Sequence, residues 1–289
     1  MTAIEIAQTG LMTKAVLANV SIGTWSGRKY DDEATQAVAD SFQAEKNWGR
    51  SNKLLVEHNA ILALMRLGSR ARQFHYLYTL PWSDVGSRLL PTKAYPMYVE
   101  GINKHSDSFW EAVDNFCEAY PTLKEMRRAA LGSLWKADDY PTIDQLRTKF
   151  NFKVNFSFLP DPNSDIRLNL NEIEIDKVRA NLADSLKKVE EKSISDLWLR
   201  MRKVVDRIVG RLGDSDKIFK NSTFENIDDL EKIVDLLNIT DNADVADTMK
   251  KIKDDLTEYD PDTIRKDDFV RKSVHKRAQD ILDKISAFV

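Results

Sequence analysis

Apolar and polar residues alternate in three stretches of the chain, and this alternation predicts β-strands. The first stretch covers residues 15–25, the second covers 152–158 and the third covers 166–170. A period of two is typical of a strand with one buried face. Turn-forming residues at 160–164 separate the last two stretches, which therefore form a predicted hairpin. Because a lone hairpin is only marginally stable, we expect it to join the first strand in a small antiparallel sheet.

Elsewhere in the first half, apolar residues recur at intervals of three and four, which predicts helices that pack on this sheet. Asp31 or Asp32 is a predicted helix cap, and Pro121 is expected to open a new helix. Residues 81–96 are predicted to be irregular. The predicted helices cover residues 31–48, 54–78, 97–119, 121–135 and 141–150.

Residues 172–212 are predicted to form one long helix. Their apolar positions are mostly three or four residues apart, so they form a narrow stripe like that of a coiled coil. Three further helices are predicted at 224–238, 242–259 and 262–288, and the last is expected to fold back along the long helix. The pattern predicts an α+β protein, mostly α, with an α+β domain at 1–170. A helical, coiled-coil-like hairpin or bundle follows at 171–289.

Composition narrows the class of protein. Of the 289 residues, 42% are hydrophobic and 31% are charged, which excludes wholesale disorder. The net charge of −3 excludes a polycationic coat for duplex nucleic acid but not a local basic patch. Cys117 is the single cysteine, which excludes an intramolecular disulfide and a cysteine-based zinc site. No long apolar run or signal peptide is present, so we expect a cytoplasmic protein without a membrane partner.

Motifs for catalysis or cofactor binding are absent from the sequence. Neither a P-loop nor a dinucleotide-binding glycine pattern occurs. The four histidines, His58, His75, His105 and His275, lack the spacing of a metal site. No nucleophile elbow is present either. We therefore predict a protein that is not an enzyme and that has no cofactor and no metal.

A basic and aromatic segment gives moderate support for nucleic-acid binding. Residues 46–93 contain eight Lys and Arg residues against two acidic residues, with aromatic residues among them. Cations that contact phosphates and rings that stack on bases are the components of a single-strand interface. The alternative is that the rings face the core and the arginines lie over them. The predicted interface consists of Trp25, Arg28, Lys29, Trp48, Arg50, Arg66, Arg70 and Arg72.

The long helix suggests a second kind of interface. Its apolar stripe, with the cations beside it, is the predicted contact with a second copy or with a partner protein. We expect these cations to form salt bridges with the acid-rich residues 225–260 in preference to contacts with DNA. The predicted interface consists of Leu197, Met201, Val204, Ile208, Arg200, Lys203 and Arg207.

Four motifs follow one another in the first half: W-S-G-R-K at 25–29, T-L-P-W at 79–82, R-L-L-P at 88–91, and Phe150–Phe158 with Pro160. In this order they resemble an uncharacterised family of bacteriophage and prophage proteins. The resemblance implies a bacterial or phage cytoplasmic setting. It also implies gene neighbours that serve replication or recombination, or that encode MoxR-type AAA+ ATPases. It implies no catalytic residues.

These observations favour a non-enzymatic, phage-type protein that binds a macromolecule, with a slight preference for single-stranded nucleic acid. The alternative is an assembly or adaptor protein. Its long C-terminal helices would form a homo-oligomer or dock onto an AAA+ ATPase or a host defence protein. Whether Trp25 and Trp82 lie at the surface or in the core stays open at this point.

Overall fold

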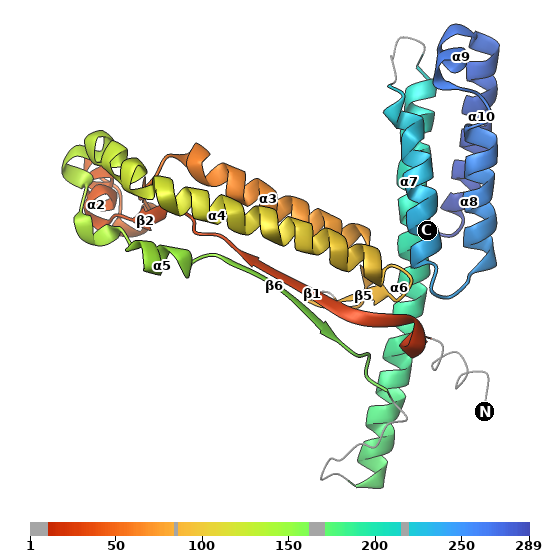
Figure 1. Ribbon diagram of the computed structural model, residues 1–289, viewed down its shortest axis with the longest axis horizontal. Helices are drawn as coiled ribbons and strands as arrows, with labels where there is room; N and C mark the ends of the chain where they lie inside the picture. The colour runs from red at the N-terminus through yellow and green to blue at the C-terminus, as the bar shows by residue number, and fades with distance from the viewer. Residues whose placement is uncertain (1–10, 84–85, 162–170, 215–219) are drawn as a thin grey trace. The chain divides into compact units, whose positions relative to one another are not determined.

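The computed structural model describes residues 11–83, 86–161, 171–214 and 220–289 (Figure 1). The chain forms an α+β protein that is mostly helical, as the sequence predicts. It divides into two compact units, each built from separate stretches, so the division does not follow the predicted boundary at residue 170. Unit 1 contains Met1–Asn19, Tyr76–Tyr98 and Asn155–Val289, and unit 2 contains Val20–His75 and Val99–Val154.

The main sheet has four strands in the order β4-β5-β1-β6. The alternating residues form β1 (Ala15–Gly23) and β6 (Asn151–Ser157), as predicted. The other two strands, β4 (Leu80–Pro81) and β5 (Arg88–Pro91), lie where we expected irregular chain. They pair with one another, and β5 also pairs antiparallel with β1. Strands of two and four residues are too short to show a period. The third predicted strand, 166–170, lies outside the described residues.

Two long helices lie side by side in unit 2, α3 (His58–Leu77) and α4 (Tyr95–Leu131) (Figure 1). They approach closely at Gly101, where an added Cβ would lie 2.1 Å from Cζ of Phe74. The predicted break at Pro121 is wrong, because α4 continues through it. A proline inside a helix removes one backbone hydrogen bond but does not always end the helix.

A second, two-stranded sheet belongs to unit 2. It pairs β2 (Arg28–Tyr30) antiparallel with β3 (Asn52–Leu54), and neither strand was predicted, since the helix expected at 54–78 began within β3. Between them, α2 (Asp32–Ser41) begins at its cap Asp31, as predicted, but ends seven residues before the expected position. The 3₁₀ turns are η1 (Lys46–Trp48), η2 (Gly132–Leu134) and η3 (Ala137–Asp139). The short α5 (Ile143–Arg147) begins with a capping box at Thr142.

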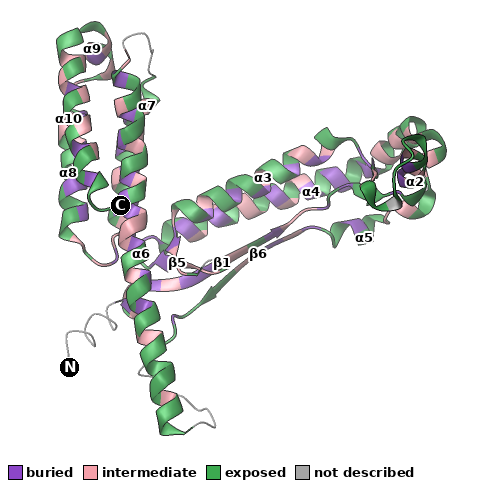
Figure 2. Cartoon of the chain, turned by 180° about the vertical axis from the view of Figure 1, so that it is seen from behind, coloured by how far each residue is buried: buried purple, intermediate pink, exposed green. Residues whose placement is uncertain are grey.

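The C-terminal helices of unit 1 surround a hydrophobic core that also contains Leu17 of β1, Leu80 of β4 and Leu89 of β5. The long α6 (Glu172–Leu212) is confirmed, and it begins with a capping box at Asn171. The shorter helices are α7 (Ser222–Leu237), α8 (Ala243–Leu256), α9 (Pro261–Lys266) and α10 (Asp268–Ser286). As expected, α10 packs along α6, and buried residues lie on the inner faces of these helices (Figure 2).

The last predicted helix is in fact two helices. Asp267 has extended backbone angles, φ −118° and ψ 107°, and so separates α9 from α10. Its carboxylate accepts hydrogen bonds from the backbone N–H groups of Phe269 and Val270, which gives α10 its own cap.

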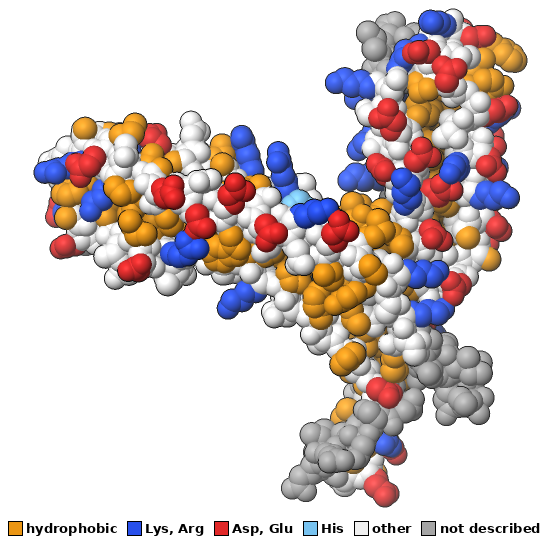
Figure 3. All heavy atoms as spheres, viewed as in Figure 1, with side chains coloured by type: hydrophobic (Ala, Val, Ile, Leu, Met, Phe, Trp, Pro, Cys, Tyr) orange, Lys and Arg blue, Asp and Glu red, His pale blue; other side chains and the backbone are white. Residues whose placement is uncertain are grey.

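The outer surface of this helical region mixes basic and acidic side chains (Figure 3). Within the described parts of the chain, no helix combines the length and the apolar character needed to cross a membrane.

Candidate nucleic-acid interface

The W-S-G-R-K motif forms a turn followed by the exposed strand β2. Gly27 has a positive φ of 61°, and an added Cβ there would lie 2.2 Å from Cδ1 of Ile61. The backbone N–H of Leu55 donates to the Gly27 carbonyl at 2.7 Å, which fixes the turn against the end of β3. A glycine is therefore required immediately before Arg28.

Trp25 belongs to the core of unit 2, so its assignment as a base-stacking residue is wrong. It is 9% exposed. Its ring centroid lies 5.9 Å from that of Tyr120, edge to face, and 6.3 Å from that of Phe116. An aromatic group packed on two others adds to stability and cannot accept a base. The sequence also left open whether Trp82 lies at the surface or in the core. Trp82 is partly buried and packs against the core of unit 1.

Lys29 and Lys53 lie opposite one another across the β2–β3 pair and hold the same carboxylate. Nζ of Lys29 is 2.7 Å from Oδ1 of Asp139, and Nζ of Lys53 is 2.5 Å from Oδ2. Lys53 is buried and also contacts Oδ2 of Asp31 at 2.7 Å and the Leu134 carbonyl at 2.9 Å. This ion cluster joins β2, β3, the cap of α2 and η3.

The contacts of the cluster favour the charged forms of Asp31, Lys53 and Asp139. Hydrogen bonding from Lys53, aided by the backbone N–H of Ala34, lowers the pKa of Asp31. Burial opposes charge on Lys53, but hydrogen bonds to Asp139 and Asp31 outweigh it and raise the pKa of this lysine. Burial likewise opposes charge on Asp139, and its bonds to Lys29 and Lys53 lower its pKa. Such groups stabilise the fold and are poor general acids or bases at neutral pH.

Beside this cluster lies a surface of cations and exposed rings, here called the β2 surface: Arg28, Lys29, Tyr30, Trp48 and Arg50. Tyr30 is 41% exposed and Trp48 is 49% exposed. The Arg50 guanidinium lies 5.7 Å from the centre of the Tyr30 ring. In the described part of the chain, neither Arg28 nor Arg50 forms an ion pair. A hollow of about 430 Å³ is lined by Tyr30, Asn47, Gly49 and Arg50.

A second hollow, here called the Lys149 hollow, adjoins Arg28 and has a volume of about 340 Å³. Its lining brings together β2 and the segment around α5, which are more than 100 residues apart. Among the described residues, Lys149 has no ion pair. The lining residues are Trp25, Arg28, Lys29, Leu55, Asp138, Asp139, Tyr140, Pro141, Gln145 and Lys149.

The predicted arginines of α3 are not part of the β2 surface. Arg66 and Arg70 are exposed on α3. Arg66 lies eight residues beyond the start of this helix, which is about 12 Å along its axis. Arg72 has a structural contact instead, because its Nη2 donates to the Ile22 carbonyl at 2.6 Å. Of the eight predicted residues, Arg28 and Lys29 lie on β2, and Trp48 and Arg50 lie in or beside η1, from which Arg50 reaches the Tyr30 ring of β2.

Other residues of the same chain already cover the apolar stripe of α6. Leu197 is 1% exposed, and Met201 and Ile208 are fully buried. Val204 is partly buried against the same core. The prediction that this stripe is a free surface for a partner is therefore wrong.

The cations beside the stripe also differ from expectation. Arg200 pairs with Asp196 of its own helix instead of with residues 225–260. Its guanidinium donates to three backbone carbonyls at the end of α3. Lys203 and Arg207 are exposed.

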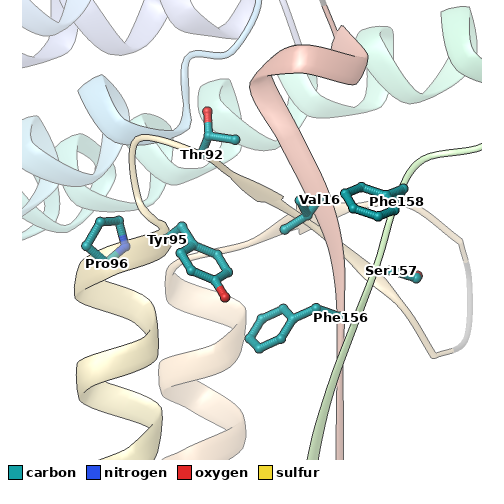
Figure 4. Close-up of a pocket in the computed structure, with 7 residues that line it drawn as sticks. All are labelled: Val16, Thr92, Tyr95, Pro96, Phe156, Ser157 and Phe158. Carbon is teal, nitrogen blue, oxygen red and sulfur yellow. The ribbon is translucent and has the colours of Figure 1, made fainter.

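An apolar hollow of about 400 Å³ lies beside β6 in unit 1. Figure 4 shows Val16, Tyr95 and Phe156 pointing toward one another, while Ser157 points to the other side of β6. The Tyr95 and Phe156 ring centroids are 5.3 Å apart, and Phe158 is 89% exposed. The hollow has few polar groups and no cationic side chain among its lining residues, so it does not suit a nucleic acid.

Sequence reasoning missed two residues of the candidate interface, Tyr30 and Lys149. Tyr30 follows the two predicted cations directly in the sequence, and this adjacency was the available signal. Lys149 gave no signal, because only the tertiary fold brings it to β2.

Comparison with known proteins does not identify the chain: no protein-family model, no curated protein and no solved structure matches it. The geometry of unit 2 is therefore the basis on which a function can be proposed.

Proposed function

We propose that unit 2 binds single-stranded nucleic acid through the β2 surface. The observation that carries this proposal is the combination of unpaired cations and half-exposed rings on one small surface. Neither Arg28 nor Arg50 forms an ion pair among the described residues, so both can contact phosphates. Trp48 is 49% exposed, and Tyr30 is 41% exposed with the Arg50 guanidinium over one face of its ring. An exposed aromatic side chain adds about 1–3 kcal/mol per stacked base.

A single strand fits this surface better than a duplex does. Only an unpaired base can place its face against Tyr30 or Trp48. A duplex would rely on phosphate contacts spread over a wide basic area. The chain carries a net charge of −3, and acidic side chains are mixed with basic ones over the helices of unit 1 (Figure 3). The partner we propose is therefore a flexible strand that is held at a few points.

An assembly or adaptor role is the alternative. The residues that suggested it, Leu197, Met201 and Ile208, pack inside unit 1. The contacts of the structure thus favour the nucleic-acid proposal.

The test is a fluorescence-anisotropy titration of a 3′-labelled single-stranded oligonucleotide at several salt concentrations. The variant Arg28→Ala/Arg50→Ala removes two unpaired cations. Its slope of log K against log salt should fall by about 1.4, because each phosphate contact contributes about 0.7 for single strands. Tyr30→Ala should weaken binding roughly tenfold and leave the slope unchanged, since stacking is not an ionic contact.

The matched control is Lys203→Ala/Arg207→Ala, which removes two exposed cations from α6. It should bind like the unmodified protein. Equal weakening in both double variants would mean that binding is general electrostatic attraction, and the β2 assignment would be wrong. Absence of binding at low salt would overturn the proposed function itself.

A further inference from the structure

We infer that the Lys149 hollow binds a phosphomonoester, carried by the end of a nucleic-acid strand or by a free nucleotide. The inference rests on the proposed function, since it assigns a specific role to the hollow next to the β2 surface. The hollow has about 340 Å³ of space, which is at the lower end of the range for small-molecule sites. That space suits one terminal nucleotide and not a longer piece of strand.

The charges that line the hollow favour an anion. Arg28 and Lys149 approach it from two distant parts of the chain, and neither has an ion pair among the described residues. Lys29 also lines it. Of the two carboxylates there, Asp139 is already compensated by contacts with Lys29 and Lys53. Asp138 is exposed and is the negative charge that opposes an anion.

The hollow also offers a buried donor that lacks an acceptor. Tyr140 lines it and is 8% exposed. Within the described residues its hydroxyl finds no acceptor, since the Trp135 indole beside it is itself a donor. An unsatisfied buried hydroxyl costs stability, and a phosphate oxygen would provide the acceptor it lacks.

A terminal phosphate suits this lining better than an internal one. A phosphomonoester carries about −1.5 to −2 charges at pH 7, whereas a phosphodiester within a strand carries a single charge. Arg28 and Lys149, the two lining cations without an ion pair among the described residues, gain more from the larger charge. Arg28 lies two residues from Tyr30 on β2, about 6.7 Å along the strand. A strand whose end occupies the hollow can therefore continue over the Tyr30 ring.

The experiment compares oligonucleotides of one sequence with a 5′-phosphate, a 3′-phosphate or hydroxyl groups at both ends, by anisotropy with an internal label. One phosphorylated end should bind roughly tenfold more tightly than the hydroxyl form, since the gain comes from charge-assisted hydrogen bonds. Lys149→Gln should abolish that preference, and Asp138→Asn should increase it. Lys153→Gln is the matched control, because Lys153 is exposed on β6 and does not line the hollow.

A calorimetric titration with AMP and with adenosine separates the two sources of phosphate. Binding of AMP without binding of any oligonucleotide would support the phosphate site and overturn the proposed function. Equal affinity for all three oligonucleotides, with the Arg28→Ala/Arg50→Ala effect intact, would overturn the inference alone. A preference that survives in Lys149→Gln would also overturn it. If neither AMP nor any oligonucleotide binds, both proposals are wrong.

Discussion

Lys53 joins several elements of unit 2 through one side chain. Its ammonium group is buried between Asp31 and Asp139, and it also binds the Leu134 carbonyl. Taking these charges out of water is costly, and their mutual contacts offset that cost only while every partner is present. Lys53 therefore keeps β2 and η3 in the positions that form the β2 surface and the Lys149 hollow.

This arrangement predicts a pH dependence of stability with a definite sign. The pKa values of Asp31 and Asp139 are lowered in the folded protein. A lowered carboxyl pKa stabilises the fold above the unfolded value of about 4, and this contribution is lost as the pH falls through the lower folded value. The cluster should thus contribute fully at pH 7 and progressively less below about pH 4.

The variant Lys53→Met should show the opposite dependence of relative stability on pH. Two buried carboxylates then lack their shared cation, and the free energy of unfolding at pH 7 should fall by about 3 kcal/mol. Asp139 keeps Lys29 and Asp31 keeps the Ala34 backbone N–H, but burial is then less well compensated and both pKa values should rise. Acidification from pH 7 to pH 5 should therefore narrow the gap in stability between the variant and the unmodified protein. Urea unfolding at both pH values measures this. A gap that widens toward pH 5 would contradict the cluster as described.

At the scale of elements, the T-L-P-W and R-L-L-P motifs have a structural role in unit 1. They supply β4 and β5, and Leu80, Leu89 and Leu90 are fully buried. Arg200 of α6 donates to the carbonyls of Tyr76, Leu77 and Thr79 at 2.7–2.9 Å. The last carbonyls of a helix have no partner within it, so Arg200 completes the end of α3.

Arg200→Met tests this role. Removing the three hydrogen bonds to carbonyls together with the ion pair to Asp196 should lower the free energy of unfolding by about 2–3 kcal/mol. Lys203→Met removes an exposed cation of the same helix and should change the free energy of unfolding by less than about 0.5 kcal/mol. Urea denaturation followed by circular dichroism compares the two. Equal stability of both variants would show that Arg200 is dispensable at the end of α3.

Elements with a strong period could be predicted from the sequence, and short ones could not. The alternation of β1 and the stripe of α6 extend over 9 and 41 residues, which is enough to show their periods. The strands β2 and β3 have three residues each, and their pairing depends on the turn at Gly27. Composition also does not distinguish a stacking ring from a core ring. Trp25 is buried and Trp48 is half exposed, although both stand near cations in the sequence.

At the scale of the whole molecule, the apolar stripe of α6 packs the C-terminal helices of one chain together. Ile208 is fully buried against the core that α6 shares with α7, α8 and α10. A coiled-coil stripe in the sequence is satisfied either by a second copy or by helices of the same chain. The structure shows the second arrangement, so disruption of the stripe should unfold unit 1 instead of dissociating an oligomer.

Ile208→Asp distinguishes the two arrangements. An unpaired carboxylate in this core should cost more than about 4 kcal/mol, and the helical circular-dichroism signal should fall. Arg207→Asp changes the exposed neighbour and should leave both the helical signal and the mass unchanged. Light scattering gives the mass for comparison with the 33.1 kDa of one chain. An Ile208→Asp protein that keeps its full helical signal while its mass falls would show that the stripe joins separate chains.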